Sequence, residues 1–104
     1  MQIQVNTDSN IVGDQALEAR IKDKLESVLA RFASHLTRLE VHLSDKNAAR
    51  GGSDDIACVI EARLEGRQPL AVDAREATVE RAVAAAAQKM RSLLDSELGR
   101  ARPY

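Results

Sequence analysis

The chain has 104 residues, and its 15 Lys and Arg residues nearly balance 16 Asp and Glu residues, so the formal net charge is −1 at pH 7. A chain of this length folds as one domain without disulfides or metals, and the balanced charge excludes the bulk basicity that favours nonspecific binding to nucleic acid. The lone Cys58 has no partner for an internal disulfide, and neither a leader pattern nor an apolar run of roughly 20 residues is present, so we expect a cytoplasmic protein without membrane partners.

The first predicted element is a strand over residues 2–6, where apolar and polar side chains alternate as a half-buried strand requires. The polar residues 7–10 end it, because short Asp, Ser and Asn side chains bond to nearby backbone and favour turns. Asp14 is placed to cap a long amphipathic helix that we expect to run to about residue 33 or 35. The predicted buried stripe of this helix is Leu17, Ile21, Leu25, Val28, Phe32 and Leu36.

The polar side of this helix is asymmetric. Arg20, Lys24 and Arg31 fall on one flank of the apolar stripe when successive residues are spaced about 100° apart around the axis. We call these three residues the basic flank, and its charge is compatible with phosphate binding. The alternative interpretation is an ordinary solvated face with ion pairs inside the helix.

Three further strands are predicted by alternation at residues 39–43, 56–65 and 70–75. Residues 44–55 lack apolar periodicity and contain a Gly-Gly pair, which indicates a long, mobile connection. A short turn with Gly66 and Pro69 joins the last two strands, since glycine adopts positive φ easily and proline blocks further pairing. The predicted inward-facing residues are Leu39, Val41, Leu43, Ile56, Cys58, Ile60, Ala62, Leu64, Leu70, Val72 and Ala74.

A second long helix is predicted over residues 76–98, with Val79, Val83, Ala86, Met90, Leu93 and Leu94 buried. Its Ala84–Ala87 run has high helix propensity and little bulk, so it permits close packing. We therefore expect one domain over residues 1–98, followed by a basic flexible tail at 99–104. The order of elements predicts an α+β fold: a βαβββα two-layer sandwich with both helices on one face of a four-stranded mixed sheet.

Enzymatic and metal-binding chemistry is poorly supported by the sequence. Alternation places Cys58 inside and His42 outside, so the two cannot form a nucleophile and base pair. His35 and His42 lack the additional ligands that a metal site requires. Phe32 and Tyr104 are the only aromatic residues, so base stacking is not available. We expect no catalytic site, metal, cofactor or small-molecule substrate, and any RNA contact would read phosphates and shape.

Besides the order of elements, the chain has several distinctive local patterns: Ala16-Leu17 followed by Lys24-Leu25 and Phe32, the strand Leu39–Leu43, and the turn Leu64-Glu65-Gly66. In these features the chain resembles the ribosome hibernation promoting factor and ribosome-associated inhibitor family (protein Y, sigma-54 modulation protein). The resemblance extends from Met1 to about Leu94. Because the chain ends near residue 104, it resembles the short form of that family.

This resemblance implies a cytoplasmic stress-response protein that binds the small ribosomal subunit in the channel of mRNA and tRNA and blocks translation. Binding would use Lys and Arg against rRNA phosphates and would weaken with salt. On this interpretation the candidate rRNA-binding residues are Arg20, Lys24, Arg31, Arg63, Arg75, Arg81, Lys89 and Arg91.

One difference from the family leaves an alternative open. Family members usually carry a dense run of Lys and Arg in the second helix, whereas Ala84–Ala87 and Ser92–Leu94 occupy the corresponding turns here. The alternative is a protein-interaction or dimerisation module that kept the fold and lost ribosome binding. Its interface would be the alanine-rich helix or an open sheet edge, and its partner could be a second copy.

Overall fold

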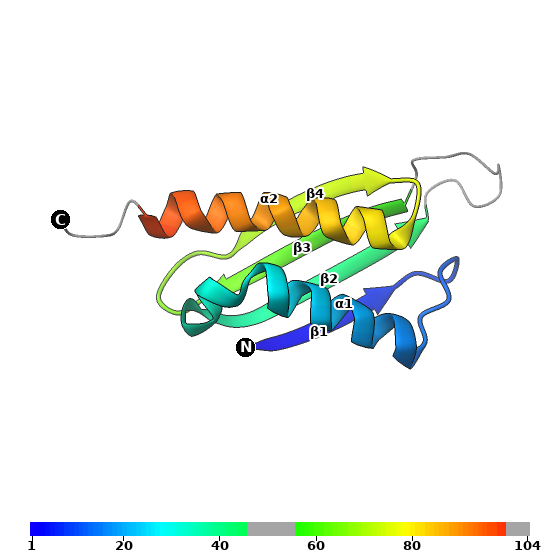
Figure 1. Cartoon of the computed structure of the whole chain (residues 1–104), viewed down its shortest axis with the longest axis horizontal. Helices are drawn as coiled ribbons and strands as arrows, with labels where there is room; N and C mark the ends of the chain where they lie inside the picture. The colour runs from blue at the N-terminus through cyan, green and yellow to red at the C-terminus, as the bar shows by residue number, and fades with distance from the viewer. Residues whose placement is uncertain (46–55, 100–104) are drawn as a thin grey trace.

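The computed structural model describes residues 1–45 and 56–99, which form a four-stranded sheet with both α-helices on one face (Figure 1). Most of the predicted connection at 44–55 and the tail after Gly99 lie outside the described residues. The elements are β1 Gln2–Thr7, α1 Gln15–Val28, a 3₁₀ helix η1 Ala30–His35, β2 Leu36–Asp45, β3 Ile56–Leu64, β4 Leu70–Glu76 and α2 Val79–Gly99.

The sheet has the strand order β1-β2-β3-β4, with β1 parallel to β2 and the other neighbours antiparallel. Ile60 on β3 lies opposite Val41 on β2 and Val72 on β4. These three branched side chains form a row across the strands on the face that the helices cover. The predicted α+β architecture with a mixed sheet and both helices on one face is confirmed.

Helix α1 begins as predicted and ends earlier than predicted. The Asp14 carboxylate accepts a hydrogen bond from the Leu17 amide at 2.8 Å, which satisfies one of the free donors of the first turn. The α-helix stops at Val28 and continues as η1. Leu29 is fully buried, whereas the predicted Val28 is half-buried. The tighter 3₁₀ winding of about three residues per turn then keeps Phe32 on the same buried side as Leu29.

Leu36 was assigned to the helix stripe by the sequence pattern, and this assignment is wrong. It is the first residue of β2, paired with Leu64 of β3, and the pairing register shifts between Leu36 and Arg38. This irregularity lets Leu36 and Leu39 both point into the core although they are three residues apart. Strand β2 is therefore longer at both ends than the predicted 39–43.

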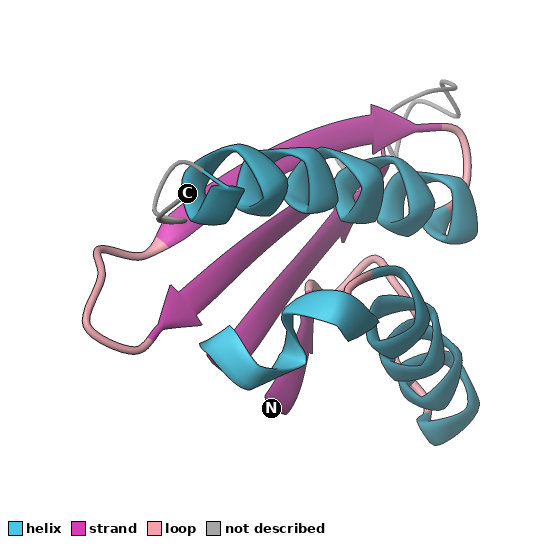
Figure 2. Cartoon of the chain, turned by 60° about the vertical axis from the view of Figure 1, so that its left-hand side comes forward, coloured by secondary structure: helices cyan, strands magenta, loops and turns pink. Residues whose placement is uncertain are grey.

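Helix α2 begins three residues later than predicted, because Glu76 still belongs to β4. The Thr78 hydroxyl accepts a hydrogen bond from the Arg81 amide at 3.1 Å and so caps the helix. The alanine-rich stretch packs inward as expected, since Ala82, Ala86 and Ala87 are fully buried. Helix α2 packs against β3 and β4, and Figure 2 shows it lying along this part of the sheet. The small alanine side chains permit this close approach.

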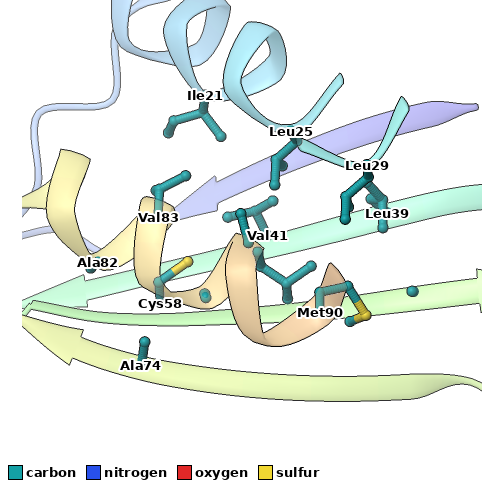
Figure 3. Packing of buried hydrophobic residues seen from close by; sticks show 14 of the residues in the cluster. Ile21, Leu25, Leu29, Leu39, Val41, Cys58, Ala74, Ala82, Val83 and Met90 are labelled. Carbon is teal, nitrogen blue, oxygen red and sulfur yellow. The ribbon is translucent and has the colours of Figure 1, made fainter. Parts of the chain in front are cut away.

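The core is one cluster between the sheet and the helices. Figure 3 shows Leu25 above Val41 of β2 and Leu29 beside Leu39 of the same strand, while Met90 belongs to the same cluster from α2. Because the helices cover only one face, the opposite face of the sheet stays open, and Val59 on β3 is 37% exposed there. The described surface therefore has two distinct sides: the helix side and the open face of the sheet.

Candidate nucleic-acid interface

The basic flank of α1 and η1 faces helix α2. Arg20 and Lys24 line a cavity of about 230 Å³ between the helices, together with Glu80 on its α2 side. Its remaining lining is Leu17, Ile21, Val79, Val83 and Ala84. We call this feature the interhelix groove; it has an apolar floor and a charged rim. Arg31 continues the basic flank from η1.

Two members of the basic flank are paired with carboxylates of α2. The Arg20 guanidinium lies 3.6 Å from the Glu80 carboxylate, and that of Arg31 lies 3.1 Å from Asp95. The Arg31 guanidinium carbon also lies 4.9 Å from the centre of the Phe32 ring, a cation–π contact. Both ion pairs are well exposed, with side-chain exposures of 59% and 65% in the first and 49% and 59% in the second. Water and salt therefore weaken both pairs.

Lys24 and Arg91 supply the unpaired positive charge on this side of the molecule. Neither forms an ion pair with a residue in the described ranges 1–45 and 56–99. Arg91 lies four residues before Asp95 on α2, which places the two on the same side of the helix. Since Asp95 reaches the α1 side, Arg91 borders the same surface. The groove side thus carries Arg20, Lys24, Arg31 and Arg91, two of them paired.

Arg81 and Lys89 of α2 point elsewhere. Arg81 lies 3.6 Å from the Glu76 carboxylate at the end of β4. The Lys89 ammonium donates a 2.7 Å hydrogen bond to the Asp73 carbonyl of β4, which is the strand at the edge of the sheet. A lysine at an edge strand hinders pairing with another chain. These two cations are associated with the β4 edge and are separated from the groove.

Arg63 and Arg75 lie on the open face, on the other side of the sheet from the helices. Arg63 contacts Glu40 at 3.4 Å and Glu61 at 3.0 Å. Arg75 lies opposite Ala57 of β3 and is exposed. The eight predicted residues are therefore not gathered on one surface, and this open-face group cannot contact the same short RNA segment as the groove.

The sequence interpretation missed three residues of these surfaces. Arg38 joins the open face, where it contacts Gln4 and lies 3.8 Å from Glu40; it was overlooked because β2 begins earlier than predicted. Glu80 and Asp95 were also missed as partners of the basic flank. Their shared side on α2 was visible in the residue spacing, but their pairing with α1 depends on how the two helices cross.

Cys58 and His42 do not form a reactive pair. Cys58 is fully buried on the helix side of the sheet, and burial raises the pKa of its thiol to about 12. His42 lies on β2, exposed on the other face. Within the described residues no group of three or more His, Cys, Asp or Glu side chains is placed to hold a metal ion. None of the described helices is long and apolar enough to cross a membrane.

Comparison with known proteins relates the sequence to a family and the fold to solved structures. The model of the family described as sigma 54 modulation protein / S30EA ribosomal protein matches residues 3–102. A comparison with curated protein sequences found no significant match. Among solved structures, a ribosomal subunit interface protein from Coxiella burnetii superposes with a TM-score of 0.79 at 13% identity, over 95% of this chain and 99% of that one.

The N-terminal domain of Protein Y from Thermus thermophilus superposes with a TM-score of 0.73 at 18% identity, over 93% of this chain and 99% of that domain. At such low identities these likenesses concern the fold, whereas the family match concerns the sequence over nearly its full length. The chain belongs to the sigma 54 modulation protein / S30EA ribosomal protein family.

Proposed function

We propose that this protein is a hibernation factor that binds the small ribosomal subunit in the cytoplasm and inhibits translation under stress, through contacts to rRNA phosphates. The observation that carries the proposal is the family match over residues 3–102, because that family is described as ribosomal. The interhelix groove supports a location for the contact, since Arg20, Lys24, Arg31 and Arg91 border one side of the molecule.

The proposed recognition reads phosphates and shape. Phe32 is the aromatic residue of the described part, and it is buried beneath Arg31, so it offers no surface for stacking bases. Arginine and lysine contacts to phosphates carry little sequence information but fix position and give strong salt dependence. A protein of this kind would recognise an rRNA surface by its arrangement of phosphates.

Co-sedimentation with purified bacterial small subunits tests the proposal. Wild-type protein is expected to pellet with the subunits at low salt and to be released as the salt concentration rises. Reversal of the basic flank in the triple variant Arg20→Glu, Lys24→Glu, Arg31→Glu is expected to abolish pelleting. Circular dichroism of the variant checks that it remains folded.

A matched pair of single variants sharpens the location. Lys24→Glu and Lys22→Glu make the same charge change on the same helix, but Lys24 lines the groove while Lys22 pairs with Glu18 at 3.2 Å. Only Lys24→Glu is expected to weaken pelleting. Equal losses from both variants would contradict a contact at the groove.

The second candidate is a dimerisation module that kept the fold and lost ribosome binding. The observation that favours it is the pairing of Arg20 and Arg31 with Glu80 and Asp95, which removes charge from the basic flank. Its proposed interface is the alanine-rich helix or an open sheet edge. Ala86 and Ala87 are buried against the sheet, so the helix would offer the half-buried Ala84 and Ala85. Failure to pellet at low salt, together with a concentration-dependent dimer in analytical ultracentrifugation, would favour this candidate.

A further inference from the structure

Glu80 and Asp95 reach from α2 to the two ends of the basic flank. Glu80 lies 3.6 Å from Arg20 near the start of α2, and Asp95 lies 3.1 Å from Arg31 in its second half. At about 1.5 Å of rise per residue the two carboxylates are separated by roughly 22 Å along the helix. The first pair lies at the interhelix groove, whose lining includes Arg20 and Glu80, and the second lies further along the two helices, with Lys24 between them on the α1 side.

These two ion pairs contribute little to holding the helices together. Exposed pairs are screened by water and salt and stabilise folded proteins only weakly. The helices are held instead by the apolar contacts beneath them, such as those of Ile21, Leu25 and Val83. The main effect of each carboxylate is therefore on the arginine that it contacts, whose charge it partly neutralises.

We infer that Glu80 and Asp95 are internal counter-ions of the basic flank that limit its affinity for RNA and lower the salt dependence of binding. This inference rests on the proposed function. A phosphate can contact Arg20 or Arg31 at full strength only by displacing the carboxylate already there. A partner gains from both arginines only when it presents phosphates at both ends of the basic flank. The carboxylates thus disfavour short or badly spaced polyanions.

The inference can be measured through the salt dependence of the binding constant K. If Arg20, Lys24, Arg31 and Arg91 all neutralised phosphates, log K would fall with log salt at a slope of about −2.8, using about −0.7 per phosphate for a single strand. If only Lys24 and Arg91 neutralised phosphates, the slope would be about −1.4. A fourfold rise in salt concentration would weaken binding about 7-fold in this second case and about 50-fold in the first.

The test uses the full-length chain and the double variant Glu80→Gln, Asp95→Asn, which frees both arginines with little change in shape. Its control is Glu18→Gln, Glu65→Gln, which makes the same total charge change. Glu18 pairs with Lys22 on the other flank of α1, and Glu65 is exposed near the β3–β4 turn. Affinity for purified small subunits is measured by fluorescence anisotropy of N-terminally labelled protein between about 50 and 200 mM KCl at fixed Mg²⁺. Melting temperatures check the folded state.

The groove variant is expected to bind about tenfold more tightly at the lowest salt concentration and to show a slope steeper by about 1.4, while the control keeps the wild-type slope. Binding by the variant when wild type does not bind also supports the inference. If the wild-type protein binds and the groove variant has the same affinity and slope as the control, the inference is overturned and the proposed function stands. Absence of binding by every protein at the lowest salt concentration overturns both.

Discussion

The groove and the open face of the sheet both combine arginines with carboxylates, but they differ in how much water reaches them. On the open face Arg38 and Arg63 converge on Glu40, whose side chain is only 19% exposed. On the groove side the carboxylates of Glu80 and Asp95 are more than half exposed. The arginines themselves are similarly exposed, at 41% and 51% for Arg38 and Arg63. We therefore expect the shielded Glu40 carboxylate to contribute more to stability than the exposed carboxylates, which another anion can replace more easily.

Strand register explains why the open-face network is needed. Arg38 lies opposite Arg63, and Glu40 lies opposite Glu61, so like charges face each other across β2 and β3. Such pairs are destabilising unless opposite charges lie close by. The diagonal contact between Arg63 and Glu40, at 3.4 Å, supplies that compensation. The Arg20–Glu80 and Arg31–Asp95 pairs, in contrast, each join one arginine to one carboxylate and lie apart along the two helices.

The largest expected effect is a difference in folding stability between substitutions on the two faces of β3. Ile60 is fully buried on the helix side, whereas its neighbour Val59 is partly exposed on the open face. Ile60→Ala is expected to lower the free energy of unfolding by about 2–5 kcal/mol, because it removes buried methyl groups and leaves a cavity. Val59→Ala is expected to cost less than about 1 kcal/mol. Urea denaturation measures both, and equal costs would show that the open face is covered.

The next prediction compares how much the groove and the open face of the sheet contribute to binding RNA. Neutralising the groove with Arg20→Gln, Lys24→Gln, Arg31→Gln is expected to weaken binding to small subunits on the order of 10- to 100-fold at low salt. The matched open-face variant, with Arg38, Arg63 and Arg75 changed to Gln, removes the same charge. It is expected to change the affinity no more than about threefold. The reverse order in an anisotropy titration would place the RNA contact on the open face.

The smallest effect concerns the ion pairs themselves. Glu40→Gln removes a shielded carboxylate shared by two arginines and is expected to lower the free energy of unfolding by roughly 1 kcal/mol. Asp95→Asn breaks an exposed pair and is expected to cost less than about 0.5 kcal/mol. A chain of this size loses about 4–8 °C of melting temperature per kcal/mol, so thermal scans resolve the difference. A larger loss for Asp95→Asn would mean that the groove pairs hold the helices together.

Local patterns were sufficient to predict the layers of the fold, and they failed where two elements meet. Alternation correctly assigned Val41, Ile60 and Ala74 to the helix side of the sheet, because a strand with one covered face must repeat every two residues. The 3.6-residue period correctly placed Leu17, Ile21 and Leu25. It failed at Val28, where the α-helix ends before the 3₁₀ helix and Leu29 takes the buried position assigned to Val28, although Phe32 is buried as predicted.

The sequence by itself determined which residues are buried over most of the chain, the order of strands and helices, and the presence of a basic flank on α1. Only the tertiary structure decided what that flank faces. Its arginines meet Glu80 and Asp95, which are more than fifty residues away in sequence, because α1 and α2 lie beside each other on the same face of the sheet. Helical periodicity fixes the direction of a side chain around its own axis, but the neighbour that it meets depends on packing between elements, which no local pattern encodes.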